Sequence, residues 1–160
     1  MKIVILAGGK GSRFSGLTEF VPKPLINVNG KPIIKKIVDH YSHYGFKDFV
    51  IPVGYKGEMI KNYFKNFDLN NSNLKIKFNP NKVIEYDKKF EGLSFQIIDT
   101  GLETLTALRL YKIKDVLMED IFMLTYGDGL SDVNITQLLD FHKSHGKIGT
   151  MTIIRPPGRF

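Results

Sequence analysis

The chain has 160 residues, of which 42% are hydrophobic and 24% are charged, a composition typical of one globular domain. It has no cysteine, which excludes disulfides, thiolate metal sites and cysteine nucleophiles and favours a cytoplasmic location. Its apolar runs are far shorter than the roughly 20 residues that cross a bilayer, so we predict no membrane insertion. The formal net charge of +7 suits an anionic partner, and the lysines are scattered without a block of like charges, which favours a small phosphorylated ligand over nucleic acid.

Strand and helix patterns alternate along the chain, which predicts an α/β fold with a mostly parallel sheet. In chain order, we expect strands over residues 3–7, 48–53, 74–78, 93–98, 121–124 and 148–154. Between them, we expect helices over residues 32–44, 57–67, 103–117 and 134–145, the last with Asn134 as its N-cap and Gly146 after its end. Residues 80–92 are charged and irregular, as in a flap or an insertion. We find no linker and no internal repeat, so the sequence predicts a single domain over residues 1–160.

A glycine-rich stretch follows the first expected strand. Residues 6–13 have the sequence LAGGKGSR, and glycines after a strand allow backbone N–H groups to point at an anion. The P-loop pattern fails here, because Lys10 precedes Gly11 and the second glycine of that pattern is missing. The dinucleotide fingerprint also fails, because Phe14 stands where it requires a glycine. The loop therefore indicates phosphate binding of another kind.

This loop, followed by Pro22-Lys23-Pro24-Leu25, resembles the signature of the sugar-1-phosphate nucleotidyltransferases. Motifs in the rest of the chain narrow the resemblance to the glucose-1-phosphate cytidylyltransferases within that family; they lie at residues 46–49, 54–57, 99–101, 126–129, 140–143 and 156–160. The resemblance extends over nearly the whole chain but only over the N-terminal part of those enzymes, which continue for roughly another hundred residues. The end at Phe160, directly after an expected strand, therefore looks like a truncation.

The resemblance implies a Rossmann-like, doubly wound fold with its ligand at the carboxyl ends of the strands. It also implies the reaction of CTP with a sugar 1-phosphate, which gives a CDP-sugar and pyrophosphate. A phosphate oxygen of the sugar attacks the α-phosphorus of CTP in line, and no covalent nucleophile is needed. The protein has to position two polyanions and neutralise their charge, which requires cations and backbone donors.

The same resemblance assigns roles to residues near the N-terminus. Arg13 would bind the departing β- and γ-phosphates, because its planar fork suits bidentate phosphate contacts. Lys23, presented between two prolines, would bind the reacting phosphates. The nucleotide would be held along the glycine-rich loop by Leu6, Ala7, Gly8, Gly9, Gly11 and Ser12. Lys10 is as well explained as a solvated loop lysine.

Asp128 is the expected magnesium ligand. It follows a buried strand between Gly127 and Gly129, and a carboxylate at the end of a central strand is well placed beside phosphates. The alternative is a turn aspartate, since Asp-Gly is a common turn sequence. In the family that the chain resembles, a second aspartate ligand comes from beyond the end of this sequence.

Base recognition is expected from residues 106–109. The family has roughly Thr-Gly-Gly-Arg there, whereas this chain has Thr106-Ala107-Leu108-Arg109. Thr106 and Arg109 keep their places in the nucleotide site, although Arg109 is equally explained as a surface helix arginine. Ala107 and Leu108 replace glycines that allow the backbone to approach cytosine, and this departure leaves another nucleoside triphosphate or another acceptor open.

Two further alternatives stay open at this point. One is a nucleotide-binding module that lacks the acceptor site, and the other is a basic nucleic-acid-binding protein. We also expect a homo-oligomer, because a strand over residues 148–154 at the end of the chain would expose an edge and apolar surface.

Overall fold

The computed structural model of the chain describes residues 1–11, 19–77, 83–86, 90–118 and 121–155. Its contacts divide it into two compact units, Met1–Leu130 and Ser131–Phe160, and each is described by itself. The single domain that the sequence predicts over residues 1–160 stays a prediction. None of the helices in the described ranges is long and apolar enough to cross a membrane.

The first unit is built on a four-stranded sheet in which every strand runs parallel to its neighbours. The strands are β1 (Lys2–Leu6), β4 (Asp48–Val53), β7 (Ser94–Asp99) and β8 (Met123–Tyr126). Their order across the sheet is β7-β4-β1-β8, and the register places Leu6 beside Tyr126. The predicted α/β fold with a parallel sheet is therefore confirmed.

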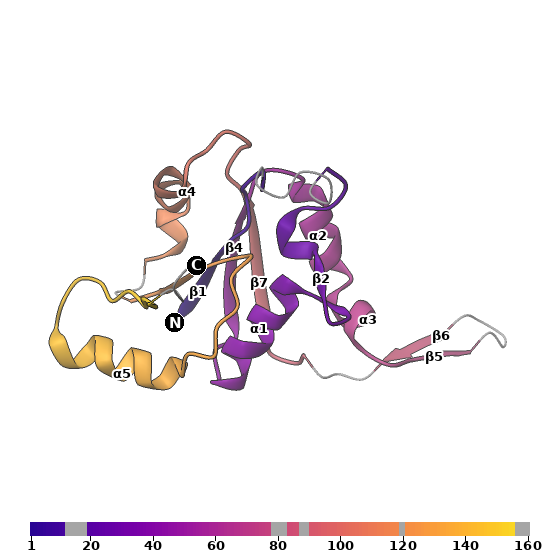
Figure 1. The fold of residues 1–160 in the computed structure, drawn as a ribbon. Coiled ribbons are helices and arrows are strands. Elements are labelled where there is room, and N and C mark those ends of the chain that lie inside the picture. The colour runs from indigo at the N-terminus through magenta and orange to yellow at the C-terminus, as the bar shows by residue number, and fades with distance from the viewer. Residues whose placement is uncertain (12–18, 78–82, 87–89, 119–120, 156–160) are drawn as a thin grey trace, which may run out of the picture. The chain divides into compact units, whose positions relative to one another are not determined.

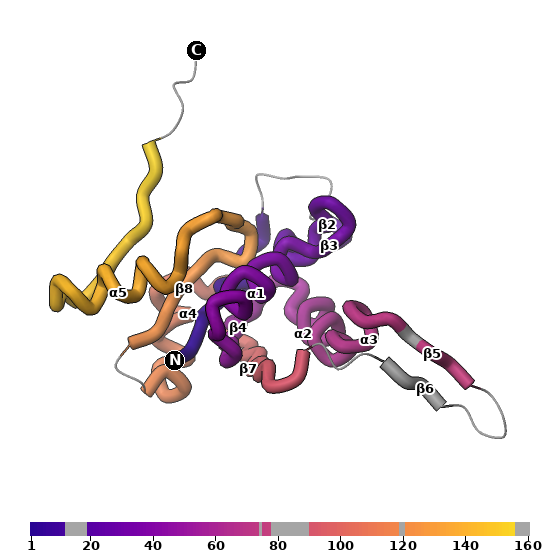
Figure 2. Tube along the Cα trace, turned by 90° about the horizontal axis from the view of Figure 1, so that it is seen from below, coloured from indigo at the N-terminus to yellow at the C-terminus, as the bar shows by residue number. Residues whose placement is uncertain are grey.

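Helices cover both faces of this sheet. The helices α1 (Ile33–His43) and α2 (Gly57–Lys65) lie on one side, and α4 (Thr106–Lys112) lies on the other (Figures 1 and 2). Buried residues recur in α1 at helical spacing, as in Ile34, Val38 and Tyr41, which gives the helix one apolar face to pack on the sheet. Helices on both faces make the fold doubly wound, as predicted from the sequence.

After their first residues, Lys2 and Asp48, the central strands β1 and β4 are apolar, because both of their faces are covered. Side chains alternate along a strand, so Val4 and Leu6 share a face, where they pack with Val50 and with Ile113 at the end of α4. Residues at the positions between them point to the opposite face, and Ile5 there is fully buried.

Short elements complete the first unit. They are η2 (Lys23–Leu25), β2 (Asn27–Val28), β3 (Lys31–Pro32), α3 (Phe67–Asn71), β5 (Leu74–Lys77), β6 (Val83–Tyr86) and η3 (Lys114–Val116). β5 and β6 pair antiparallel, and this ribbon extends away from α3 (Figure 1). Residues 83–86 of the stretch 80–92, which the sequence describes as irregular, therefore form one strand of this ribbon.

Two helices are shorter than the ranges that the sequence predicts for them. The helix expected over residues 57–67 ends at Lys65, and α3 begins at Phe67. The helix expected over residues 103–117 begins only at Thr106. The Thr104 hydroxyl donates to the Thr100 carbonyl at 2.5 Å, and a side chain that bonds the backbone in this way favours a loop over a helix.

The second unit contains α5 (Ile135–His145). Its ends are as predicted: the Asn134 side chain accepts a hydrogen bond from the Gln137 amide at 3.0 Å, and Gly146 follows at φ +62°. The expected strand over residues 148–154 is wrong, since residues 147–155 form no strand. A strand needs a hydrogen-bonded neighbour, and no strand within the described ranges pairs with this segment. Its apolar side chains are exposed, Ile153 at 81%.

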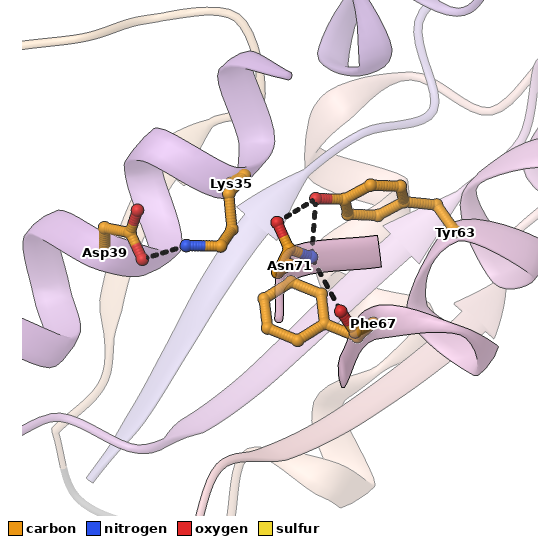
Figure 3. Close-up of polar contacts among 5 residues, drawn as sticks. All are labelled: Lys35, Asp39, Tyr63, Phe67 and Asn71. Carbon is orange, nitrogen blue, oxygen red and sulfur yellow. Dashed lines mark hydrogen bonds and ion pairs between the residues drawn. The ribbon is translucent and has the colours of Figure 1, made fainter. Parts of the chain in front are cut away.

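A polar network joins α2 to α3 next to α1 (Figure 3). The Asn71 amide donates to the Tyr63 hydroxyl at 3.2 Å and to the Phe67 carbonyl at 2.7 Å. On α1, the buried Lys35 pairs with Asp39 four residues later. Burial raises the pKa of the Tyr63 phenol, the Asn71 hydrogen bond opposes that rise, and the charge of Asp39 adds to it.

These contacts predict how stability responds to alkaline pH. The pKa of Tyr63 is higher in the folded chain than in the unfolded chain, so its contribution is constant below about pH 10 and is lost as the pH rises through the folded pKa. Replacing Tyr63 by Phe should make the free energy of unfolding fall less steeply above pH 10. It should also cost about 1 kcal/mol at pH 8, because the bond to Asn71 is lost. Urea denaturation at several pH values measures both effects.

The matched control is Tyr111→Phe, because Tyr111 is 62% exposed. Its free energy of unfolding at pH 8 should stay within about 0.5 kcal/mol of the parent. If Tyr63→Phe kept the parental alkaline slope, the Tyr63 phenol would titrate alike in the folded and unfolded chain, contrary to the prediction.

Candidate functional site

A cavity of about 370 Å³ lies at the carboxyl ends of β1 and β8. The strand order β7-β4-β1-β8 places β4 on one side of β1 and β8 on the other, and ligands of open α/β sheets bind at such a reversal. The cavity is lined by Leu6, Ala7, Gly8, Gly9, Lys10, Gly11, Lys23, Pro24, Leu102, Glu103, Thr104, Leu105, Thr106, Arg109, Tyr126, Gly127 and Asp128.

This lining brings together most residues that the sequence assigns to the site. They are Leu6, Ala7, Gly8, Gly9, Gly11, Lys23, Thr106, Arg109 and Asp128. Ser12 and Arg13 lie outside the described residues. Sequence reasoning missed the wall formed by residues 102–105, although the neighbouring Asp99-Thr100-Gly101 motif marked the region. It also missed Tyr126, which directly precedes the Gly127-Asp128 pair.

The glycine-rich loop is fixed on its inner side and open on its outer side. The Gly8 carbonyl accepts hydrogen bonds from the Tyr55 amide at 3.2 Å and from Arg109 Nη2 at 2.9 Å. A Cβ atom placed on Gly9 would have no atom of the described residues within 4 Å. Gly11 has φ +65°, in the region that favours glycine. The loop therefore presents open backbone to the cavity.

Lys23 and Asp128 meet across this cavity. The Lys23 Nζ lies 2.5 Å from the Asp128 Oδ2, and both side chains are partly exposed. Gly127 makes the approach possible, because a Cβ there would lie 2.9 Å from the Leu6 carbonyl and 3.1 Å from the Pro24 ring. A glycine at this position thus allows η2 and the end of β8 to pack against the end of β1.

Arg109 lies beneath the loop and is only 5% exposed. Its Nη1 donates to the Val53 carbonyl at 3.0 Å and to the Thr100 hydroxyl at 2.5 Å. Its Nη2 donates to Gly8 and, at 3.3 Å, to the Leu102 carbonyl. Burial lowers the pKa of the guanidinium, and the charge of Asp99 opposes that change. The alternative of a surface helix arginine is therefore wrong.

The wall that faces the loop is braced from below. The Thr100 carbonyl accepts hydrogen bonds from Lys112 Nζ at 2.7 Å and from the Thr104 hydroxyl. At the rim, Lys10 pairs with Glu103 at 2.5 Å, and both side chains are exposed to solvent. Ion pairs between exposed side chains contribute little to stability, so the Lys10 ammonium and the Glu103 carboxylate are both available to a charged ligand.

The donor set suits one particular kind of metal site. No cluster of three or more His, Cys, Asp or Glu side chains occurs in the part of the chain that the structure describes. The carboxylates of the lining belong to Glu103 and Asp128, and each faces a lysine. Mg²⁺ bound to phosphates needs only one or two protein carboxylates. The site therefore fits a Mg²⁺ that arrives with a phosphorylated ligand.

Comparisons with known proteins agree with this geometry. The family model described as "Nucleotidyl transferase" matches residues 2–159. A protein of Salmonella typhimurium named "Glucose-1-phosphate cytidylyltransferase" is 44% identical over 161 residues, which cover 100% of this chain and 63% of the relative. One of Bacillus subtilis named "Probable glucose-1-phosphate cytidylyltransferase" is 39% identical over 160 residues, with the same coverage. The chain thus spans 63% of the length of these relatives.

Solved structures share the fold. "UTP-bound UGPase" of Acinetobacter baumannii superposes with a TM-score of 0.70 at 18% identity, over 91% of this chain and 53% of that chain. The "CTP:phosphocholine Cytidylyltransferase" of Streptococcus pneumoniae superposes with a TM-score of 0.55 at 25% identity, over 79% of this chain and 44% of that one.

The close approach of three segments predicts the effect of a methyl group at Gly54. A Cβ there would lie 2.6 Å from the Gly101 carbonyl and 2.7 Å from Arg109 Nη1, and neither group can easily move. Gly54→Ala should lower the free energy of unfolding by about 1–3 kcal/mol, as overpacking does. Urea denaturation monitored by circular dichroism measures the change.

Gly9→Ala is the matched control, because a Cβ there meets no atom within 4 Å among the residues that the structure describes. Its effect on stability should stay within about 0.5 kcal/mol. Equal losses for the two variants would show that the packing around Gly54 is not as tight as described.

Proposed function

Because the chain belongs to the nucleotidyl transferase family, we propose that it binds CTP and serves the transfer of CMP to a sugar 1-phosphate, with release of pyrophosphate. The observation that carries this proposal is the cavity at the strand ends, where an open glycine-rich loop faces the Lys23–Asp128 pair. Since the chain spans 63% of its relatives, the complete reaction and the sugar acceptor belong to the proposal.

The loop and the lysines suit a triphosphate. Open backbone at Gly9 can approach phosphate oxygens closely, and Lys10 and Lys23 supply positive charge on two sides of the cavity. In-line attack on the α-phosphorus needs the reactants held in place and their charge neutralised, with no covalent nucleophile. Ser12 and Arg13 keep their predicted roles at the phosphates, from outside the described residues.

The Lys23–Asp128 pair suits an exchange of partners on ligand binding. Asp128 would hold a Mg²⁺, which when bound neutralises phosphate charge. Lys23, freed from the carboxylate, would then contact the phosphates directly. The pair is partly exposed, so separating it costs little, and both charges gain stronger partners.

Cytosine is the base that the relatives favour, and the geometry of α4 is compatible with it. Thr106 lines the cavity at the start of the helix. Ala107 and Leu108, the departures from the family motif, are exposed, and neither is among the described residues that line the cavity. The two changes therefore do not narrow this cavity, and the cytidylyltransferase names of the Salmonella typhimurium and Bacillus subtilis relatives support CTP over another triphosphate.

The test is calorimetric titration of the chain with CTP, UTP, ATP and GTP, each with Mg²⁺. We expect selective binding of CTP. Asp128→Asn should weaken it about tenfold or more, because a charged ligand of the metal is lost, whereas Asp132→Asn, at an exposed position, should not. Selective binding of another triphosphate would overturn the cytidine assignment, and no binding by the folded chain would overturn the site.

The same experiments test the alternatives that the sequence leaves open, one of which is a module that binds the nucleotide without the acceptor. CTP binding without pyrophosphate release in the presence of glucose 1-phosphate would support such a nucleotide-binding module. Salt-sensitive binding of an oligonucleotide in place of CTP would instead support the nucleic-acid alternative.

Self-association is part of the proposal. The segment after α5 exposes Met151, Ile153 and Ile154 at 81–82% each, and exposed apolar surface of this kind drives association. We expect light scattering to show oligomers, and Ile153→Lys with Ile154→Lys to shift them towards monomer. A clean monomer for the parent at high concentration would contradict this prediction.

A further inference from the structure

We propose that Arg109 is a positioning residue that shapes the glycine-rich loop from beneath by joining the carboxyl ends of β1, β4 and β7. The proposal rests on the proposed function for the identity of the ligand. Its structural part stands on the hydrogen bonds, burial and packing of the guanidinium, which the chain shows without a ligand.

The hydrogen bonds of Arg109 connect three strands. Its acceptors include the carbonyl of Gly8, just after β1, the carbonyl of Val53, the last residue of β4, and the hydroxyl of Thr100, just after β7. Parallel strands end at one edge of a sheet, where carbonyls project beyond the ladder. A planar guanidinium can satisfy several of them at once, because its donors form a rigid fork.

These contacts leave little of Arg109 for a ligand. The side chain is 5% exposed, and both terminal nitrogens donate to protein oxygens. The acceptors are carbonyl and hydroxyl groups, so the dipoles of these groups stabilise the buried positive charge of the guanidinium. Removing the guanidinium would leave the Gly8 and Val53 carbonyls with their backbone donors, the Tyr55 and Thr100 amides. It would remove the hydrogen bonds that join the two carbonyls to one group, and it would leave a buried space in their place.

Gly8 is needed because of this arginine, and Gly54 because of the arginine and the Gly101 carbonyl together. A Cβ on Gly8 would overlap Arg109 Cζ and Nη1 and would lie 2.8 Å from Nε. A Cβ on Gly54 would lie 2.7 Å from Nη1. The guanidinium therefore lies flat against the backbone, and the path of the loop at Gly8 depends on it. At Gly9, one residue later, a Cβ would meet no described atom within 4 Å.

Thr106 and Arg109, at the two ends of the segment 106–109, have different roles. Both residues line the cavity, but Thr106 is exposed, whereas Arg109, three residues later, is 5% exposed and lies under the loop. Thr106 is therefore placed to meet a ligand. Arg109 acts on the ligand through Gly8.

The first test needs no ligand. Amide hydrogen exchange, resolved by NMR, should be at least tenfold faster at Tyr55 and Thr100 in Arg109→Ala, because these amides donate to Gly8 and Val53, the carbonyls that Arg109 also holds. Ile113→Val, a core variant that weakens the same unit, is the control and should leave these amides protected relative to its global stability. Parental exchange in Arg109→Ala would overturn the proposal.

The second test distinguishes positioning from direct contact. Titrations with CTP and with inorganic pyrophosphate, each with Mg²⁺, should both weaken about tenfold or more in Arg109→Ala, since both probes use the loop. Free guanidinium at a non-denaturing concentration should restore part of the affinity. Loss of CTP affinity alone, with unchanged pyrophosphate affinity, would mean that Arg109 contacts the nucleoside and would overturn the proposal.

A double-mutant cycle completes the design. Gly8→Ala should weaken pyrophosphate binding in the parent and add almost nothing in the Arg109→Ala background, where the clash is gone. Additive losses would show that Gly8 is required for another reason, against the proposal. If the parent bound neither probe, the proposed function would fail, and the exchange measurement would still decide the role of Arg109.

Discussion

Parallel pairing of β1 with both β4 and β8 is the constraint on which the rest of the structure depends. It brings the carboxyl ends of the strands to one edge of the sheet, so segments far apart in sequence share one site. It also leaves carbonyl groups at that edge that need donors. Arg109, in α4, supplies donors to them. It hydrogen-bonds to Gly8, which lies 101 positions earlier in the sequence.

Close backbone packing at this edge explains why glycines gather there. Gly8, Gly54 and Gly127 each stand where a Cβ would lie under 3 Å from a neighbouring group. A glycine-rich loop is often explained by the approach of a ligand, but here part of the requirement comes from the protein itself. Among the described residues of the loop, Gly9 has open space around it of the kind that a phosphate needs.

The expectations that failed did so for a common physical reason. The strand expected over residues 148–154 depends on a neighbour to which it could bond, and its alternating apolar residues could not show whether one exists. The helix expected over residues 103–117 began late because Thr104 bonds the Thr100 carbonyl. Both errors concern hydrogen bonds to groups outside the segment, which a periodic pattern does not record.

The sequence by itself determined the local features: the apolar run of β1, the loop after it, the caps Asn134 and Gly146 of α5, and the residues that bear charge. These follow from steric preference and burial within a few residues of each other. Only the tertiary structure decided that Lys23 faces Asp128 and that Arg109 is buried beneath Gly8. The order of strands in the sheet brings such partners together. Long-range packing sets that order, so no single segment of the sequence predicts it.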